Sequence, residues 1–332
     1  MNNRTHKYIV HDSGEVKDER LYHDCFINFL YTGIRENAPA LFRLFTGKRV
    51  SKLAATINYD IPFRSDRTRL HFVERLGIDA SECIDNFEKF KTPRQVFERK
   101  IAYWKCRPMV DEDSCVVSPA DSRIVTGTFR EDKVLYIKEK FFDIKELLGD
   151  SSWLNLFTKG DFAIFRLTPD KYHYNHSPVS GIVKDYYEIA GHYHSCNPTA
   201  VIELLTPYSK NKRTVTIIDT DVKGGSKIGI VAMIEVVALM IGQIVQCYSP
   251  AKYDNPVMVK AGLFMKAGSP KSLFRPGSST VILLFQKKKI EFLKTIISNQ
   301  MNGNIENRYT RTFSPHLIET DIKARSLVAR KK

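Results

Sequence analysis

Three segments of the sequence carry side chains that are suited to nucleophilic and proton-transfer chemistry. The first, at residues 274–285, reads FRPGSSTVILLF, in which a Pro-Gly turn and a serine pair precede an apolar run. A serine hydroxyl in such a turn can attack the peptide bond just before it, which splits the chain and leaves a carbonyl group at the new N-terminus. Most Gly-Ser-Ser segments are only turns, so the meaning of this one depends on the other two segments.

The second segment, at residues 166–181, contains two histidines that lie three positions apart between prolines, His173 and His176. Histidine titrates near neutral pH, so the pair suits proton transfer. A metal site is the alternative, but no third ligand with convincing spacing accompanies the pair, and no metal is expected. His192 and His194 alternate along the chain and are interpreted as structural or substrate-contacting residues.

The third segment is VSPADSR at residues 117–123, where Asp121 lies in a turn that contains proline. Backbone amides can hold such a carboxylate rigidly, although an aspartate that only caps a turn is commoner. Asp121, His176 and a serine of the C-terminal pair supply an orienting acid, a base and a nucleophile. Chain order places no restriction on such a triad.

The elements that must position these residues divide the chain into two regions. Residues 18–60 have helical spacing, with Asp18 as a helix cap and a break at Asn37-Ala38-Pro39, and residues 66–105 are also mostly helical. From about residue 114, runs rich in Val, Ile, Tyr and Phe alternate with turn residues. The runs predict strands at 123–128, 133–138, 162–168, 182–189, 200–205, 213–219, 228–236, 241–248, 257–265 and 279–286, and residues 290–300 predict a helix. The sequence thus predicts an α+β fold, with a helical N-terminal region (residues 1–105) and a β-rich catalytic domain (residues 106–332).

One apolar run, residues 228–245, is long enough to suggest a membrane span. Glu235 lies near its centre, where a charge costs about 2.5–3.5 kcal/mol on insertion scales. The run is also rich in Val and Ile, so two buried strands are predicted instead. A different segment, the short helix after Pro39, carries apolar and basic side chains, which fits a membrane interface, core packing or both.

The composition points to an anionic partner. The formal net charge is +14, and residues 287–332 hold 11 basic and 4 acidic groups. A basic tail suits a nucleic acid or an acidic lipid surface, or is simply a solvated terminus. Neither zinc-finger spacing nor an RNP-type strand is present, so no nucleic-acid partner is expected. Six scattered cysteines without a CxxC pair indicate reduced thiols in a cytosol-facing protein, and the N-terminus lacks the pattern of a secretory signal.

Taken together, these motifs resemble those of the phosphatidylserine decarboxylase family. VSPADSR is similar to the family's SPADG turn, residues 166–181 to R-L-x-P-x-D-Y-H-R-x-H-x-P-x-x-G, and residues 274–285 to F-x-x-G-G-S-T-V-I-x-L-F. Shorter matches lie at residues 195–198, 211–213 and 236–244. The resemblance extends from about Tyr22 to Phe285, and the histidine segment together with the serine motif makes it specific.

The resemblance implies a lyase that makes phosphatidylethanolamine and CO₂ from phosphatidylserine. Asp121 and His176 match the family's triad acid and base, and His173 matches a histidine that is linked to decarboxylation. Ser279 matches the nucleophile, and Ser278 is the alternative because some members use the first serine of a G-S-S motif. The nucleophile becomes a pyruvoyl cofactor whose carbonyl forms a Schiff base with the substrate's amine and accepts electrons as CO₂ leaves.

The expected cut at 278/279 gives a β chain of residues 1–278 and an α chain of residues 279–332. The resemblance also implies two partners, phosphatidylserine and an anionic phospholipid surface, and a homodimer of processed αβ units. The expected location is the cytoplasmic face of a membrane, as a peripheral protein without a transmembrane span.

Two residues depart from the family's pattern, because Ser122 and Ser278 stand where glycine is usual. They motivate one alternative function, an unprocessed and catalytically weak homologue that binds phospholipid. Two further alternatives are a pyruvoyl-dependent decarboxylase of a soluble amino acid and a basic nucleic-acid-binding module.

Overall fold

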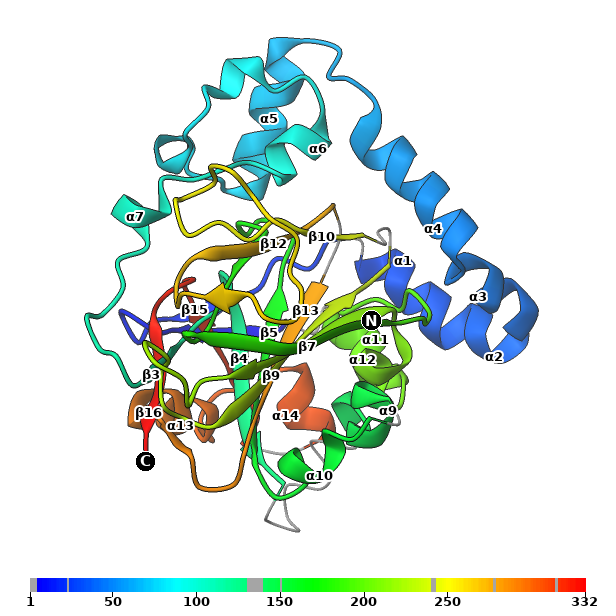
Figure 1. Cartoon of the computed structure of the whole chain (residues 1–332). Coiled ribbons are helices and arrows are strands. Elements are labelled where there is room, and N and C mark those ends of the chain that lie inside the picture. Colours follow the sequence, from blue (N-terminus) through cyan, green and yellow to red (C-terminus); the bar gives the residue numbers. More distant parts are fainter. Residues whose placement is uncertain are drawn as a thin grey trace.

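A ten-stranded sheet forms the centre of the protein (Figure 1). The structure is a computed structural model that describes residues 5–22, 24–129, 140–149, 151–239, 243–276, 279–313 and 316–332. Across the sheet the strands follow the order β11 (Phe264–Met265), β7 (Gly181–Ile189), β8 (Arg213–Asp219), β9 (Ile230–Val237), β13 (Ser279–Phe285), β5 (Asp161–Leu167), β4 (Ser122–Thr128), β15 (Glu319–Ile322), β1 (Lys7–Val10) and β2 (Val16–Asp18). Neighbouring strands are antiparallel, except that β1 and β15 are parallel.

The middle strands are buried on both faces, which explains their continuous apolar sequence. Side chains alternate across a strand. Val281 and Leu283 of β13 therefore belong to one core, and Ile282 and Leu284 belong to the other. Every residue of β13 is buried.

Each face of the large sheet has its own cover. One face packs against α13 (Lys294–Gln300) and two small sheets. The first small sheet has the strand order β10 (Ile244–Gln246), β12 (Pro270–Phe274), β6 (Tyr174–His176). The second has the strand order β14 (Ile290–Phe292), β16 (Leu327–Lys331), β3 (Cys115–Val117). The other face packs against five short helices: α9 (Ile144–Leu148), α10 (Leu154–Phe157), α11 (Pro198–Glu203), α12 (Pro207–Lys210) and α14 (Arg308–Thr312). These helices gather at one side of the sheet in Figure 1.

The remaining helices belong to the N-terminal part and arch over one end of the sheet in Figure 1. They are α1 (Asp24–Asn28), η1 (Phe29–Ile34), α2 (Arg35–Asn37), α3 (Pro39–Phe45), α4 (Lys48–Ala55), η2 (Thr56–Asp60), α5 (Asp66–Leu76), η3 (Ala80–Glu82), η4 (Phe87–Lys89), α6 (Pro93–Phe97) and α7 (Tyr103–Cys106). Tyr31 and Phe42 anchor this region by packing against Ala200 and Leu239. The longest of these helices, α5, begins with a capping box at Ser65 and ends at Gly77, whose φ of 66° suits glycine.

The α+β class predicted from the sequence is confirmed, and the helices are mainly N-terminal as expected. The predicted strands at 123–128, 162–168, 182–189, 213–219, 228–236 and 279–286 correspond to β4, β5, β7, β8, β9 and β13. The run at 257–265 forms only the short strand β11 at its end. The predicted strand at 133–138 lies outside the described residues.

Three local predictions were wrong or only partly right. Residues 200–205 were expected to form a strand, but they lie in and after α11, because Asn197 caps a helix that has Pro198 in its first turn. Asp18 ends strand β2 rather than capping a helix, and the first helix begins at Asp24. Residues 290–300 begin with strand β14, and only the second part is helical.

The apolar run at 228–245 contains strand β9 and the start of β10, as the sequence predicted. Within the described part of the chain, no helix is long and apolar enough to cross a membrane.

Candidate active site

Ser279 is the first residue of β13, where it pairs with Leu167 on β5 and Val237 on β9. Its side chain is buried, and its Oγ has no hydrogen-bond partner among the described residues. An unpaired buried hydroxyl normally costs free energy, so such groups require a specific explanation. A hydroxyl that must remain available for reaction is one explanation. Ser278, the alternative nucleophile, lies outside the described residues.

His176 ends strand β6 and is fully buried. Its Nδ1 lies 2.8 Å from the carbonyl oxygen of Gly268, so Nδ1 carries the proton and donates it. Its Nε2 therefore has a free lone pair, which accepts a hydrogen bond from the Tyr172 hydroxyl at 3.0 Å. Burial lowers the pKa of His176 to about 4. The imidazole is thus neutral at neutral pH, which is the state that a base requires.

His173 lies just before β6 and is also fully buried. Its Nδ1 donates to the Lys171 carbonyl at 2.7 Å, and its Nε2 has no hydrogen-bond partner among the described residues. The Phe97 ring packs against the imidazole with a centroid separation of 3.6 Å. Burial, aided by the nearby Arg99 charge, lowers the pKa of His173 to about 3.

Asp121 is buried and makes its hydrogen bonds with an arginine and a backbone amide. Arg107 Nε and Nη2 donate to its carboxylate at 2.9 and 2.7 Å, and the Ala324 amide donates at 2.8 Å. Arg107 also holds the Glu82 carboxylate through two hydrogen bonds of 2.7 and 2.8 Å. Burial by itself would raise the pKa of Asp121, but Arg107 and the Ala324 amide outweigh it, so the pKa lies below its usual value.

Backbone hydrogen bonds place the three segments side by side. The His176 amide donates to the Pro119 carbonyl of the VSPADSR turn at 2.7 Å, and the Phe274 amide donates to the His173 carbonyl at 3.0 Å. Strand β12 ends at Phe274, five residues before Ser279. Among the hydrogen bonds of the described residues, none joins Asp121 to His176 or His176 to Ser279.

Ser122, one of the two departures from the family's pattern, fits its position. Ser122 is the first residue of strand β4, and its φ angle is not positive. Its hydroxyl donates to the Ala120 carbonyl at 3.1 Å. The turn therefore does not require glycine at this position.

The sequence did not indicate two residues that contact the predicted site. Arg107 pairs with Asp121, but an arginine in an irregular segment carries no pattern that predicts a buried partner. Tyr172 contacts His176 and also lies 2.7 Å from the Tyr253 hydroxyl. Tyr172 precedes His176 by four residues within the same motif, and this closeness in sequence is the one signal that could have found it.

Outside the site, His192 and His194 do lie together, with ring centroids 5.4 Å apart. His194 is buried and stacks on Phe42 at 5.9 Å, so its contacts are those of a packing residue.

Comparisons with known proteins identify the family of the chain. Residues 94–304 match the family model of phosphatidylserine decarboxylase. A phosphatidylserine decarboxylase proenzyme of Fusobacterium nucleatum is 30% identical over 316 residues, which cover 93% of this chain and 96% of the relative. The proenzyme of Chlamydia trachomatis is 29% identical over 306 residues, covering 89% and 92%.

These matches define the class of protein, a carboxy-lyase whose relatives are named as proenzymes. The chain belongs to the phosphatidylserine decarboxylase family. The family and the enzyme class that were predicted from the sequence are therefore confirmed.

Proposed function

We propose that the protein is a phosphatidylserine decarboxylase that cuts its own chain between residues 278 and 279. The observation that carries this proposal is the buried Ser279 hydroxyl without a described hydrogen-bond partner, at the start of β13 and next to the histidine segment. The relatives are named proenzymes, which implies processing of the chain after synthesis.

Self-cleavage begins when His176 Nε2 takes the proton of the Ser279 hydroxyl. The oxygen attacks the carbonyl carbon of residue 278, so an ester replaces the peptide bond. Loss of the α-proton of residue 279 expels the carboxylate of residue 278, and the dehydroalanine that remains hydrolyses to a pyruvoyl group with release of ammonia. The hydrogen bond from Tyr172 must open first, because it occupies the Nε2 lone pair in the structure.

Asp121 has the role of the orienting acid in this scheme. The turn that carries it is bonded to the His176 backbone, and Arg107 keeps its carboxylate ionised despite burial. An ionised carboxylate beside the base stabilises the imidazolium that forms when His176 accepts the proton.

Residue 279 suits a pyruvoyl group because its side chain is buried and Oγ is unpartnered among the described residues. When present, this group supplies a carbonyl that condenses with the substrate's amine and accepts the electron pair left by CO₂. His173 then relays a proton to the carbon that lost CO₂: its Nε2, which no described residue occupies, takes a proton from water and passes it to that carbon. The product is phosphatidylethanolamine.

The proposed location is the cytoplasmic face of a membrane, as a peripheral protein. The N-terminal helices expose a set of large apolar side chains, here called the N-terminal apolar surface: Phe26, Phe29, Leu41, Leu44, Leu53, Ile57, Ile61 and Leu70. Exposed arginines such as Arg43 and Arg49 accompany them. Apolar side chains enter the acyl boundary while basic groups bind anionic lipid, each contributing on the order of 1 kcal/mol. A homodimer of processed units stays a prediction, which light scattering of the purified protein would test.

Release of CO₂ from vesicles that contain carboxyl-labelled phosphatidylserine tests the proposed activity. The wild-type protein is expected to release labelled CO₂, and the Ser279→Ala variant is expected to release none. Equal release by both proteins would exclude Ser279 as the source of the cofactor. Release from free serine but not from the vesicles would favour the soluble amino-acid decarboxylase instead.

A further inference from the structure

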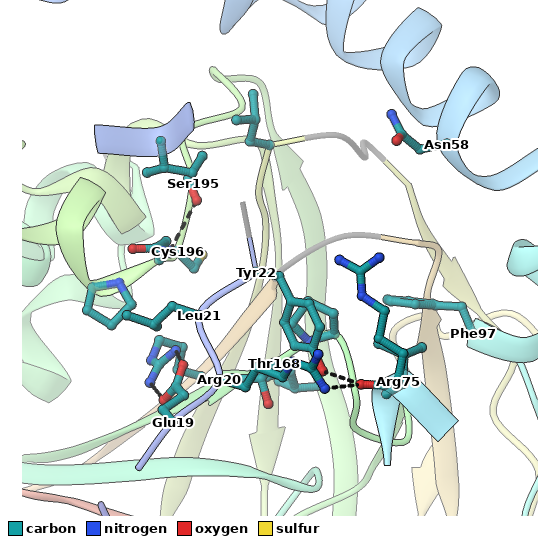
Figure 2. Close-up of a pocket in the computed structure, with 18 of the residues that line it drawn as sticks. Glu19, Arg20, Leu21, Tyr22, Asn58, Arg75, Phe97, Thr168, Ser195 and Cys196 are labelled. Atoms are coloured by element: carbon teal, nitrogen blue, oxygen red, sulfur yellow. Dashed lines mark hydrogen bonds and ion pairs between the residues drawn. The ribbon is translucent and has the colours of Figure 1, made fainter. Parts of the chain in front are cut away.

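A cavity of about 230 Å³ lies beside the start of β13 (Figure 2). Leu167 and Cys196 are part of its lining. Leu167 is the strand partner of Ser279, and the neighbouring Thr280 donates a hydrogen bond to Cys196 Sγ at 3.2 Å. The cavity therefore adjoins the position at which self-cleavage leaves the new end of the chain.

The opposite wall of the cavity comes from the N-terminal helices. Asn58 and Tyr59 of η2 line it, as do Phe72 and Arg75 of α5. The same two helices carry Ile57 and Leu70 of the N-terminal apolar surface, which are 55% and 53% exposed. The cavity is thus lined on one side by helices that carry this surface and on the other by neighbours of the start of β13.

The charged side chains of the lining are Glu19, Arg20, Arg75 and Arg166. Glu19 accepts two hydrogen bonds from Arg166, at 2.9 and 2.6 Å, so these two charges offset each other. Arg20 Nη1 donates to the Arg75 backbone carbonyl at 2.7 Å. Within the described part of the chain, neither the Arg20 nor the Arg75 guanidinium forms an ion pair. The lining therefore has an excess of positive charge and suits an anion.

Figure 2 shows the Arg75 side chain pointing into the space between Tyr22 and Phe97. Phe97 also packs on the imidazole of His173. Phe97 thus lines the cavity together with Arg75 and also contacts a histidine of the candidate active site.

We propose that Arg75, assisted by Arg20, binds the phosphodiester group of phosphatidylserine in this cavity, an inference that rests on the proposed function. The substrate has two anionic groups, a phosphodiester and a carboxylate. An arginine that held the carboxylate would stabilise the charge that must be lost with CO₂, and so would oppose the reaction. The phosphodiester keeps its charge throughout, so binding it anchors the substrate without that penalty.

The size of the cavity agrees with a headgroup ligand. Pockets for drug-sized molecules span roughly 300–1,000 Å³, and this cavity of about 230 Å³ is smaller. It has room for the glycerophosphoserine part of the lipid but not for two acyl chains. The acyl chains remain at the N-terminal apolar surface, in contact with the bilayer.

The test compares Arg75→Gln with Arg67→Gln, which removes the same charge from the exposed face of the same helix. Both variants are first checked by mass spectrometry for self-cleavage, which does not involve the substrate. With dihexanoylphosphatidylserine below its micellar concentration, Arg75→Gln is expected to raise KM by about tenfold to a hundredfold, as for a lost charged hydrogen bond. The kcat of Arg75→Gln and both constants of Arg67→Gln are expected to stay within about twofold of wild type, and Arg75→Lys is expected to restore part of the affinity.

A binding measurement separates this inference from the proposed function. Calorimetry on the uncleaved Ser279→Ala protein, with glycerophosphoserine as the probe, is expected to show binding that Arg75→Gln weakens by a similar factor. Binding that depends on Arg75 supports the inference even if the wild-type chain neither cuts itself nor releases CO₂. A wild-type protein that is active, with the same KM for Arg75→Gln as for Arg67→Gln, overturns the inference and leaves the proposed function intact.

Discussion

At the scale of single residues, the candidate site combines buried histidines that are neutral with a carboxylate that is ionised. Burial lowers the pKa values of His173 and His176 to about 3 and about 4. Arg107 keeps the pKa of Asp121 low in spite of burial. This distribution of charge suits a base that receives a proton beside an acid that stabilises the resulting cation.

Replacing Arg107 tests the state of Asp121. Without the guanidinium, burial dominates and the pKa of Asp121 rises, so the carboxylate protonates at higher pH. In Arg107→Gln, the acidic limb of the pH profile for self-cleavage is expected to move up by at least about one pH unit. Cleavage of freshly refolded proenzyme, followed by mass spectrometry across pH, measures this shift.

Two further variants serve as controls for that experiment. Arg107→Lys keeps a positive charge and is expected to retain an acidic limb close to that of wild type. Arg330→Gln removes an exposed arginine that pairs with Glu112 at the surface. If Arg107→Gln and Arg330→Gln had the same acidic limb in the pH profile for self-cleavage, Asp121 would not be the group whose protonation sets that limb.

Buried histidines also make the folded state sensitive to acid. Burial lowers the pKa of His194 to about 4, against an ordinary value of about 6.5. Between these two pH values the unfolded chain binds a proton that the folded chain does not, so the free energy of unfolding falls as pH falls. The expected slope is about 1.4 kcal/mol per pH unit for each such histidine.

The variant His194→Gln is expected to reduce that slope by about 1.4 kcal/mol per pH unit between pH 6 and 5. Urea unfolding at several pH values measures the slope. His71→Gln, which replaces an exposed histidine on α5, is the matched control and is expected to leave it unchanged. If His194→Gln left the slope unchanged, His194 would not be a source of the pH dependence of the free energy of unfolding.

At the scale of the elements, a buried carboxylate joins the sheet that carries His176 to the ten-stranded sheet. Glu235 on β9 accepts hydrogen bonds from Gln246 on β10 at 3.0 Å and from Asn175 on β6 at 3.2 Å. Lys271 on β12 completes an ion pair of 2.6 Å with the same carboxylate, and both charged side chains are fully buried. Asn175 precedes His176, so this network fixes the strand that holds the candidate base.

Loss of Glu235 is therefore expected to cost more stability than loss of Lys271. Glu235→Gln leaves a buried ammonium group without a carboxylate, which costs about 3–5 kcal/mol. Lys271→Met is expected to cost less, because Glu235 keeps the donors Gln246, Asn175 and Thr214. The double variant is expected to be more stable than Glu235→Gln alone.

Urea unfolding measures these free energies best in the Ser279→Ala background, in which the chain stays in one piece. A double-mutant cycle then gives the coupling between the two side chains. Additive losses would mean that the two charges do not depend on each other.

The elements also show how far the sequence could predict the structure. Runs that are apolar throughout, such as those of β9 and β13, were predicted because both faces of these strands are buried. The helix α11 was missed because a capping asparagine and a proline outweighed a short apolar run. Strand β1 was missed because its pairing with β15 joins the two ends of the chain, and such distant pairing leaves no local signal. Strand β2 was missed with it, because β2 joins the sheet through β1.

In the candidate site, too, residues with a local sequence signal were predicted and contacts between distant segments were not. Ser279, His173, His176 and Asp121 were predicted because each lies in a short motif. The ion pair of Arg107 with Asp121 and the pairing of Lys271 with Glu235 depend on contacts formed only by folding. Glu235 did signal an unusual environment, because a charge within an apolar run needs a buried partner.

At the scale of the whole molecule, the N-terminal apolar surface and the net charge of +14 suit an anionic membrane. Phe29 and Leu44 are 61% and 57% exposed. The double variant Phe29→Glu/Leu44→Glu is expected to weaken binding to phosphatidylserine-containing vesicles by at least about tenfold, because buried apolar side chains contribute about 1.5–3 kcal/mol each.

Cosedimentation with the vesicles measures this binding. Leu205→Glu is the control, because Leu205 is 69% exposed but lies outside the N-terminal helices. Equal binding by the double variant and the control would show that the membrane contacts a different face of the protein.

Intact-mass analysis of the purified protein shows whether the chain cuts itself before residue 279. Self-cleavage there gives two chains, residues 1–278 and residues 279–332, and the shorter chain is lighter than the unmodified peptide by the mass of one ammonia molecule. Ser279→Ala is predicted to stay whole, and Ser278→Ala is predicted to be cut. A shorter chain that begins at residue 278 would assign the reaction to the other serine. A single uncut species of 38.2 kDa from the wild-type protein would contradict self-cleavage and the pyruvoyl cofactor that depends on it.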